Sequence, residues 1–434
     1  MFDNSVIVTI LEITNIVISI ILMCIFFFQG VHMIVALFTK KKTYKDAKKN
    51  HKYGYIICAR NEEKVIKNLI ESIYSQDYPK ELMNVFVCAD NCTDSTAQIA
   101  REANAIVIEH FDSVHKGKCY ALDYIIKEIL NNKEYQDIEA FFIFDADNLV
   151  SKNYTKEMNK LFDSNVLVAT SFRSTKNYND SLVSACSGLM FLRENVITHH
   201  SRARLGLSTY VAGTGFYVSR DILEQLNGWP FTSIIEDIDF SSYCARENIK
   251  IGYSEDAVFY DEQPIKFKDA NTQHLRWIKG TYQCGSKYSK DLIKNSFNFK
   301  LKLKERISSY EMNVHISPMI IVGTTWMILY HLIHLIFFLC NIESQYYYTH
   351  VTLLIGSILL IGTIFIGILN GALPLIKYGK TLKGSFLFKL VSAIIFPLYM
   401  ITYLPIYYIA LFKKDVKWVA IAHNNTTKID ELNK

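Results

Sequence analysis

The stretch FFIFDADN, residues 141–148, decides the fold that we expect for this chain. Four large apolar residues in an unbroken run do not suit a strand with one wet face, so they predict a central strand covered on both faces. Asp145 and Asp147 then lie at its carboxyl end, the edge where open α/β sheets bind ligands. Such a pair offers hard oxygen ligands to a divalent cation. A solvated turn capped by an Asp side chain explains the same residues, so the pair needs support from the rest of the chain.

Short apolar strands followed by helical patterns occur four times in the central part of the chain. The strands are predicted at 53–59, 84–90, 105–110 and 141–144, and the segments after them carry the apolar spacing of helices. Asn61 is a candidate cap for the helix after the first strand. This alternation predicts an α/β fold with a mostly parallel, doubly wound sheet. Polar side chains follow the strands, and they would meet because parallel strands share one carboxyl edge.

The N-terminal part of the chain has the composition of a membrane anchor. Hydrophobic residues make up 50% of the whole chain, which is high for a soluble enzyme. From residue 6 to residue 38 the only acidic, basic or histidine side chains are Glu12 and His32. This run exceeds the roughly 20 residues of a spanning helix, so we expect a retained transmembrane anchor over 1–39. The basic cluster at 40–52 predicts that the following segment is cytoplasmic.

Three further apolar stretches lie near the C-terminus, at 318–340, 351–375 and 386–412. We expect a C-terminal transmembrane region over 313–412, preceded by an interfacial segment over 286–312 and followed by a tail over 413–434. One anchor and three spans would place the tail outside, whereas the basic run KKDVKW at 413–418 favours the cytoplasm. One of the three stretches therefore lies in the interface or re-enters, and the sequence leaves open which.

The polar segment between the membrane regions, residues 50–285, is long enough for one substantial core. The net charge is only +5, and Lys and Arg gather beside the apolar stretches. A lipid surface therefore explains these residues better than a nucleic acid does. Nine scattered cysteines without a C-x-x-C pair indicate reduced thiols, and neither disulfides nor zinc ligands. The turn after the first strand has no P-loop and no G-x-G-x-x-G dinucleotide motif.

Seven short motifs follow one another through this segment: ARNEE at 59–63, VCADNCTDST at 87–96, HKGKCYAL at 115–122, DAD at 145–147, AGTGF at 212–216, IIEDIDF at 234–240 and QHLRW at 273–277. In this order and spacing they resemble family 2 glycosyltransferases. More narrowly, they resemble the membrane-embedded processive group of cellulose, chitin, hyaluronan and poly-N-acetylglucosamine synthases. The resemblance covers residues 53–285 and implies a cytosolic nucleotide-sugar-binding domain of the GT-A type, inserted between transmembrane helices.

The resemblance implies inverting transfer of a sugar from a UDP-sugar to a growing polysaccharide, with export of the product as an option. The alternative within the family is non-processive transfer of a single sugar to a lipid acceptor, which shares nearly every motif. A candidate from another class is a membrane receptor or transporter that binds nucleotide without chemistry, and the intact set of Asp145, Asp147 and Asp237 argues against it. The expected partners are the UDP-sugar, a polysaccharide or lipid-linked acceptor and membrane lipids, in the plasma membrane.

Donor binding falls, by the resemblance, to residues at the carboxyl edge of the sheet. Asp90 would accept a hydrogen bond from the uracil N–H, and Lys116 and Lys118 would hold phosphate or ribose. A solvated basic turn is the structural alternative for the two lysines. Asp145 and Asp147 would bind Mg²⁺ or Mn²⁺ at the diphosphate, with Asp147 as the direct ligand. The remaining donor-site candidates are Ala59, Arg60, Asn61, Glu62, Gln273, Arg276 and Trp277, together with Asp145.

Catalysis falls, by the same resemblance, to the acidic motif IIEDIDF. Asp237 would be the general base that takes the acceptor proton, with Glu236 beside it. Burial next to another carboxylate can raise such a pKa toward the working pH. An acidic helix start that complements the helix dipole explains the same pair without chemistry. Ile235 stands where the family usually has Thr, at a position that supports the pair.

The remaining motifs concern the acceptor and the membrane side of the site. Arg276 can pair with diphosphate oxygens, Trp277 can stack beneath the acceptor sugar, and Gln273 would hydrogen-bond nearby. Arg and Trp on an interfacial helix also serve as plain membrane anchors. The glycines of AGTGF allow close backbone approach, which a plain tight turn explains equally well. The acceptor-binding candidates are Gly213, Thr214, Gly215 and Trp277.

Overall fold

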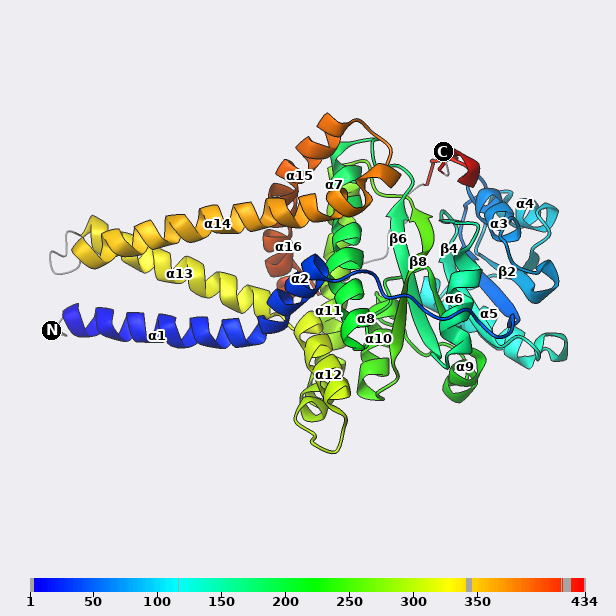
Figure 1. The fold of residues 1–434 in the computed structure, drawn as a ribbon, viewed down its shortest axis with the longest axis horizontal. Coiled ribbons are helices and arrows are strands. Elements are labelled where there is room, and N and C mark those ends of the chain that lie inside the picture. Colours follow the sequence, from blue (N-terminus) through cyan, green and yellow to red (C-terminus); the bar gives the residue numbers. More distant parts are fainter. Residues whose placement is uncertain (1–3, 116, 341–345, 415, 417–422, 433–434) are drawn as a thin grey trace.

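The computed structural model describes residues 4–115, 117–340, 346–414, 416 and 423–432. Figure 1 shows an α/β body at one end and long helices that lead away from it. The N-terminus lies at the far end of these helices, and the C-terminus lies beside the α/β body.

An eight-stranded sheet forms the centre of the α/β body, in the order β3-β2-β1-β4-β7-β6-β8-β5. The first four of these strands are parallel neighbours, so the predicted mostly parallel sheet is confirmed. β7 runs antiparallel between β4 and β6, β6 is parallel to β8, and β5 is antiparallel to β8. The strands are β1 (Tyr53–Ala59), β2 (Met83–Asp90), β3 (Ile106–His110), β4 (Ala140–Asp145), β5 (Leu149–Val150), β6 (Val168–Thr175), β7 (Phe216–Ser219) and β8 (Ile251–Asp261).

Helices cover both faces of the sheet. α3 and α6 pack on one face, and α5, α9 and α10 pack on the other. The helices of the α/β body are α3 (Ile66–Tyr74), α4 (Thr96–Glu102), α5 (Lys118–Asn131), α6 (Tyr154–Asp163), α9 (Arg220–Leu226) and α10 (Glu236–Arg246), with single turns at Lys80–Leu82, Lys133–Tyr135 and Ile429–Glu431. Both faces of the central strands are therefore buried, as their continuous apolar runs predicted.

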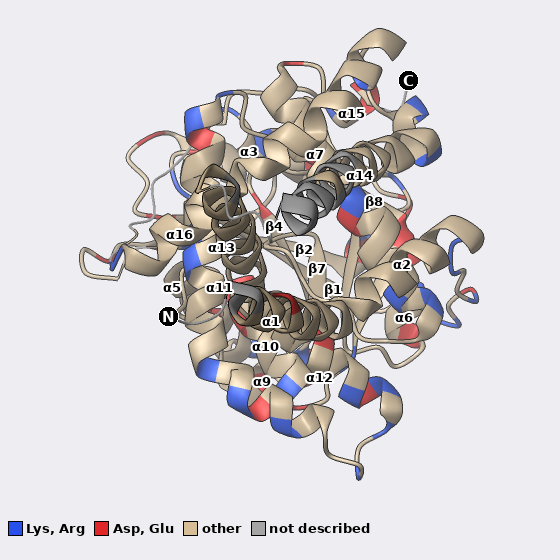
Figure 2. Cartoon of the chain, turned by 90° about the vertical axis from the view of Figure 1, so that its left-hand side faces the viewer, with Lys and Arg blue, Asp and Glu red and all other residues tan. Residues whose placement is uncertain are grey.

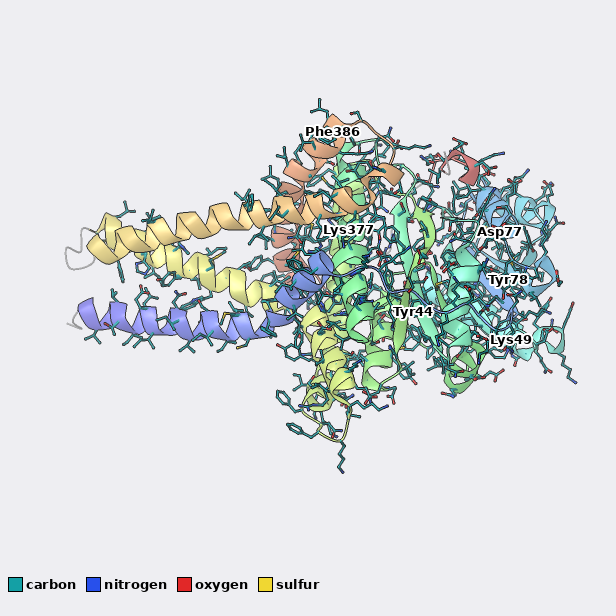
Figure 3. The ribbon with its side chains drawn as sticks, in the orientation of Figure 1. Tyr44, Lys49, Asp77, Tyr78, Lys377 and Phe386 are labelled. Carbon is teal, nitrogen blue, oxygen red and sulfur yellow. The ribbon has the colours of Figure 1, made fainter. Side chains whose placement is uncertain are left out.

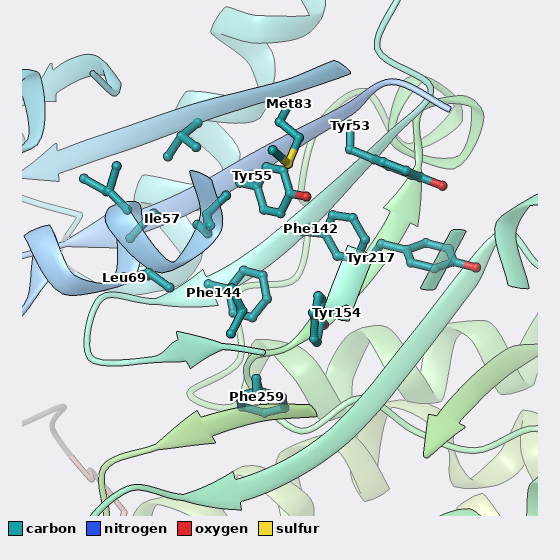
Figure 4. Packing of buried hydrophobic residues seen from close by; sticks show 14 of the residues in the cluster. Tyr53, Tyr55, Ile57, Leu69, Met83, Phe142, Phe144, Tyr154, Tyr217 and Phe259 are labelled. Carbon is teal, nitrogen blue, oxygen red and sulfur yellow. The ribbon is translucent and has the colours of Figure 1, made fainter. Parts of the chain in front are cut away.

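Aromatic side chains fill the core between the sheet and α6, as Figure 4 shows. Tyr55 stacks on Phe142 with 5.1 Å between ring centroids, and Phe144 lies in the same layer, 6.4 Å from Phe142. The hydroxyl of Tyr55 shares a hydrogen bond with Thr155 of α6 at 2.5 Å. Burying one large apolar side chain contributes about 1.5 to 3 kcal/mol, so this layer fixes β1 and β4 against each other.

The turn after β1 differs from its prediction. Asn61 adopts a left-handed backbone with φ of 58°, and α3 begins only at Ile66, with Val65 at the cap position and no capping side chain. The Asn61 side chain instead accepts a hydrogen bond from the backbone N–H of Thr93 at 2.8 Å. Asn61 is therefore not a helix cap. It ties the turn after β1 to the turn after β2, which Asn tolerates because its short side chain suits left-handed positions.

Long apolar helices extend from the α/β body. α1 (Asn4–Ile25), α13 (Met319–Leu339) and α14 (Tyr346–Tyr378) run away from it in Figure 1, while α15 (Phe386–Ile401) and α16 (Tyr403–Phe412) lie across their base. Within the described residues, three segments are long and apolar enough to cross a membrane: Val8–Ile25, Met319–Phe337 and Phe386–Phe412. The other helices at this end are α2 (Phe27–Phe38), α7 (Leu182–Arg193), a π-helix (Glu194–His199), α8 (His200–Leu205), α11 (Phe267–Ser296) and α12 (Leu303–Ile316), with a single turn at Gly379–Thr381.

α14 returns to the α/β body at its C-terminal end. Lys377, labelled in Figure 3, donates a hydrogen bond to the carbonyl of Ala36 in α2 at 2.6 Å. After this contact α15 and α16 pack against α7 and α11 and turn apolar side chains outward, with Phe386 81% and Phe412 84% exposed. The third predicted stretch therefore lies across the base of the other long helices and does not extend beside them.

Gly54 in β1 makes room for a ring of the neighbouring strand. A Cβ at this position would lie 2.6 Å from Cδ1 of Phe141 and 3.2 Å from Phe86. We expect Gly54→Ala to lower the free energy of unfolding by about 1 to 3 kcal/mol, the usual effect of overpacking a core. Thermal unfolding in detergent measures it. Gly362→Ala is the matched control, since a Cβ there meets nothing within 4 Å, and equal unfolding midpoints for the two variants would contradict the prediction.

Candidate active site

A cavity of about 1650 Å³ opens at the carboxyl edge of β1, β2 and β4 and continues to the apolar helices α2, α14 and α16. Fourteen of the sequence-predicted site residues line it: Ala59, Arg60, Asn61, Glu62, Asp90, Lys118, Asp145, Asp147, Gly213, Glu236, Asp237, Gln273, Arg276 and Trp277. Lys116 lies outside the described residues. The parallel strands thus bring the turn after β1, the turn after β4 and the start of α10 to one place, although 178 residues separate Ala59 from Asp237.

Asp90 ends β2 at the far side of this cavity, buried with 5% of its surface exposed. One carboxylate oxygen accepts hydrogen bonds from the side-chain amide of Asn91 at 2.8 Å and from the imidazole of His110 at 2.9 Å. These contacts hold the carboxylate in place through Oδ1. His110 was not predicted, although its place at the end of an apolar strand was the signal that could have identified it.

Asp145 is the last residue of β4, and Asp147 lies two residues beyond it in a different environment. The Lys118 ammonium bonds Asp145 Oδ1 at 2.5 Å, and the Asp145 backbone N–H donates to the hydroxyl of Thr214 at 2.9 Å. Asp147 is buried, with 3% exposed, and its Oδ2 accepts from the backbone N–H of Glu262 at 3.1 Å. Burial raises the pKa of Asp147, and the neighbouring Asp261 raises it further. A positive charge beside Asp147 would therefore be stabilising.

The donor set fits a hard divalent cation. Asp145 and Asp147 supply carboxylate oxygens at the strand end, which is what Mg²⁺ and Mn²⁺ prefer. Across the part of the chain that the structure describes, no three His, Cys, Asp or Glu side chains gather into a metal-binding group. An ion held here would thus take its other ligands from water and from the oxygens of a bound diphosphate, as Mg²⁺ sites with few protein carboxylates do.

Glu236 and Asp237 form the first turn of α10, so their charges also complement the helix dipole. Burial raises the pKa of both carboxyl groups, and the neighbouring charge of Asp237 raises that of Glu236 further. The Lys118 ammonium lies 3.8 Å from Glu236 Oε1 and opposes both shifts. Burial disfavours the charge of Lys118, but Asp145 and Glu236 outweigh it and hold its pKa above the usual value.

α11 closes the membrane side of this acidic turn. Its Arg276 guanidinium donates to the backbone carbonyl of Ile234 at 3.2 Å, and Trp277 packs edge-on against Phe191 with 5.9 Å between ring centroids. Ile235 packs against Gly280 of α11, where an added Cβ would lie only 2.4 Å from Ile235. Ile235, which stands where the family usually has Thr, thus packs into the space beside Gly280 of α11. It supports the turn that carries Glu236 and Asp237.

The AGTGF loop contributes less lining than the sequence suggested. Gly213 borders the cavity with φ of 82°, and its carbonyl accepts a hydrogen bond from Lys118 at 2.6 Å. Thr214 lies behind the wall, where its hydroxyl bonds Asp145 N–H and Asn148. Gly215 faces Phe259, whose ring would lie 2.2 Å from an added Cβ. These two residues shape the turn after β4 from behind, as the tight-turn alternative allowed.

Charged residues of β6, β8 and the tail also reach the cavity and were not predicted. Arg173 of β6 pairs with Asp261 of β8, and both line the cavity. Glu262, directly after β8, also lines it and pairs at 3.1 Å with Lys176, which is not part of the lining. His423, from the segment after the last helix, bonds Glu62 at 3.0 Å. Burial disfavours its charge, but Asp147, Glu62 and Glu262 outweigh burial and raise the His423 pKa to about 10. The acidic residues after the apolar run of β8 were visible in the sequence, whereas nothing in it linked His423 to them.

Comparisons with known proteins agree with this geometry. The chain is 23% identical over 274 residues to the Probable glycosyltransferase YdaM of Bacillus subtilis, a match over 61% of this chain and 62% of that protein. It is 24% identical over 277 residues to the Beta-monoglucosyldiacylglycerol synthase of a Nostoc species, over 61% of this chain and 57% of that protein. The matches thus span about three fifths of the length of these relatives.

Among solved structures, the Mannosyltransferase PcManGT from Pyrobaculum calidifontis in complex with GDP-Man and Mn²⁺ superposes with a TM-score of 0.58. The alignment covers 93% of this chain and 100% of that one at 16% identity, which establishes the shared GT-A-like fold alone. The family described as Glycosyltransferase like family 2 matches residues 51–280, more than half of the chain. This protein is therefore a glycosyltransferase and belongs to family 2.

Proposed function

We propose that this glycosyltransferase transfers a single hexose from a UDP-sugar to a hydroxyl group of a membrane lipid, with inversion at the anomeric carbon. The proposal takes the lipid-acceptor alternative in preference to polysaccharide elongation. The observation that carries it is the cavity, which joins the donor edge of the sheet to the membrane helices. The processive subgroup that the motifs resemble remains a prediction.

The membrane end of the cavity is apolar. Its wall there includes Met33 and Leu37 of α2, Leu369 and Leu373 of α14, and Leu404 of α16. An acyl chain that packs against this wall removes its apolar surface from water, which stabilises the bound lipid by about 25 cal/mol per Å². A hydrated glycan does not bury apolar surface in this way. The similarity to a protein named for a glucosylated diacylglycerol supports the same acceptor class.

The reaction joins the acceptor oxygen to C1 of the donor sugar and breaks the bond from C1 to the diphosphate. Asp237 takes the proton of the acceptor hydroxyl, and its burial makes it a stronger base than a solvated carboxylate. Lys118 and Arg276 line the same cavity and stabilise the negative charge that develops on the leaving diphosphate. A divalent cation at Asp145 and Asp147 would add Lewis-acid stabilisation of that charge.

We also propose that the α/β body faces the cytoplasm and that α1, α13 and α14 are the spans. Figure 2 looks along these helices from their free end and shows Lys and Arg, together with Asp and Glu, on the elements of the body around and behind them. With three crossings, the basic cluster at 40–52 and the tail after α16 lie on the same side, as the positive-inside rule favours. The interfacial stretch that the sequence left open is then 386–412, which exposes Phe386 and Phe412 to lipid.

Asp237→Asn removes the base, because an amide does not accept the proton. We expect the turnover rate to fall about 10²- to 10⁴-fold while UDP affinity changes little. The measurement is UDP release and lipid product formed in nanodiscs. Glu247→Gln, which removes a carboxylate at the other end of α10, is the control and should retain activity. Equal activity in the two variants would exclude Asp237 as the base.

Removing divalent cations with EDTA should abolish transfer, and Mn²⁺ or Mg²⁺ should restore it. Asp147→Asn should raise the Mn²⁺ concentration needed for half-maximal activity about tenfold or more, because it removes a charged ligand. Titration of UDP binding against Mn²⁺ gives the same shift without turnover. Asp137→Asn, at an exposed carboxylate paired with Lys52, is the control. Full activity in EDTA would contradict the prediction.

Leu404→Trp narrows the apolar end of the cavity. We expect the KM for the lipid acceptor to rise severalfold while the KM for the UDP-sugar and UDP binding stay unchanged. Leu411→Trp makes the same change at an exposed position on α16, 44% exposed, and should have no effect. The acceptor panel contains diacylglycerol, polyprenyl phosphate and oligosaccharides. A high-mass glycan product that grows without lipid would return the assignment to polysaccharide synthesis.

A further inference from the structure

The described C-terminal segment, His423–Leu432, lies across the donor edge of the cavity although it follows all the membrane helices in the chain. His423 lines the cavity together with Glu62, Asp145 and Asp147, the residues assigned above to the donor. Its Nδ1 donates to Glu62 Oε1 at 3.0 Å. Within the described residues, its other ring nitrogen has no hydrogen-bond partner, so it is available to a ligand in the cavity.

Backbone contacts hold this segment in place next to the turn after β4. The N–H groups of Asn424 and Asn425 both donate to the carboxylate of Glu262, at 3.1 and 3.3 Å. The buried ammonium of Lys176 donates to the carbonyl of Asn425 at 3.0 Å and to the carbonyl of Asp147 at 2.8 Å. One lysine therefore joins the tail directly to the backbone that carries the candidate metal ligand.

Further contacts join the segment to α3 and to the sheet. The Lys64 ammonium donates to the side chain of Asn424 at 2.8 Å, and the Asn68 side chain donates to the carbonyl of Thr426 at 3.0 Å, which joins the tail to α3 and the turn before it. Farther along, Ile429 is 7% exposed and packs against Leu149 and Tyr260. The segment is thus docked by polar contacts near His423 and by the apolar side chains of Ile429 and Leu432 beyond it.

We propose that His423 is a donor-binding residue, whose imidazolium, paired with Glu62 through Nδ1, donates a hydrogen bond from Nε2 to the diphosphate of the nucleotide sugar. Three observations combine in this assignment: the ring lines the cavity, the chain on its C-terminal side is docked, and Glu62 orients the ring through Nδ1. Orientation of one ring nitrogen by a carboxylate directs the other toward a ligand, as in other oriented histidines. The proposal rests on the proposed use of a nucleoside diphosphate donor and does not depend on the acceptor.

The test measures the dissociation constant of UDP in the presence of Mn²⁺ by calorimetry, on the full chain in nanodiscs. His423→Ala should raise the dissociation constant of UDP about tenfold or more, which is the effect of losing one hydrogen bond to a charged group. The KM for the donor should rise while the KM for the acceptor stays unchanged. His331→Ala, which removes a histidine on α13 that bonds the carbonyl of Met327 and does not line the cavity, is the matched control and should bind UDP like the unaltered chain.

Ile429→Asp tests the docked segment without touching His423. A charge in the apolar contact with Leu149 and Tyr260 should release the tail, speed amide hydrogen exchange of residues 424–432 and weaken UDP binding to the same degree as His423→Ala. In the unaltered chain, UDP with Mn²⁺ should slow that exchange. Unfolding midpoints of both variants check that the α/β body remains folded.

UDP affinities within twofold of the unaltered chain for both variants would overturn the proposal, as would a loss confined to the acceptor KM. Weaker UDP binding in both variants supports it even if no lipid is glycosylated, in which case only the acceptor assignment fails. If neither UDP nor GDP binds the unaltered chain, the donor assignment and the role of His423 are both wrong.

Discussion

Tyr55 of β1 and Phe142 of β4 lie face to face between the helical layers, and the position of the active site depends on this contact. The two strands are in register such that Cys58 lies beside Asp145. A shift of one residue would turn the aromatic side chains of β4 to the opposite face, at the expense of most of the core. The aromatic layer therefore determines where β4 ends and where Asp145 and Asp147 stand relative to the turn after β1.

The carboxylates at this edge of the sheet repel one another, and the Lys118 ammonium lies near both Asp145 and Glu236. The ammonium contacts Asp145, Glu236 and the carbonyl of Gly213, so it links one predicted metal ligand to the carboxylate beside the predicted base. Without a donor in place, this lysine supplies the positive charge that the cavity needs. A bound diphosphate would offer the same ammonium a third anionic partner, which would weaken its contact with Glu236 as the site fills.

The first half of the sheet was predictable because its strands are continuous apolar runs that end in polar residues. In the second half, β5 has two residues and β7 has four, too few for a periodic pattern to emerge, while polar residues such as Arg173 and Glu255 interrupt the apolar runs of β6 and β8. The site residues on the turns after the first, second and fourth strands were found for the same reason that those strands were. Thr214 and Gly215 fitted a motif but lie behind the wall, because a motif does not state which side of a turn meets the cavity.

The contact between His423 and Glu62 joins positions 361 residues apart in the chain. At a synthesis rate of about 5 to 20 residues per second, the two ends of that contact leave the ribosome roughly 20 to 70 s apart. During that interval the strands of the α/β body and the long apolar helices can form, but the last wall of the cavity does not yet exist. The order of synthesis therefore delays the finished site until the rest of the fold is in place.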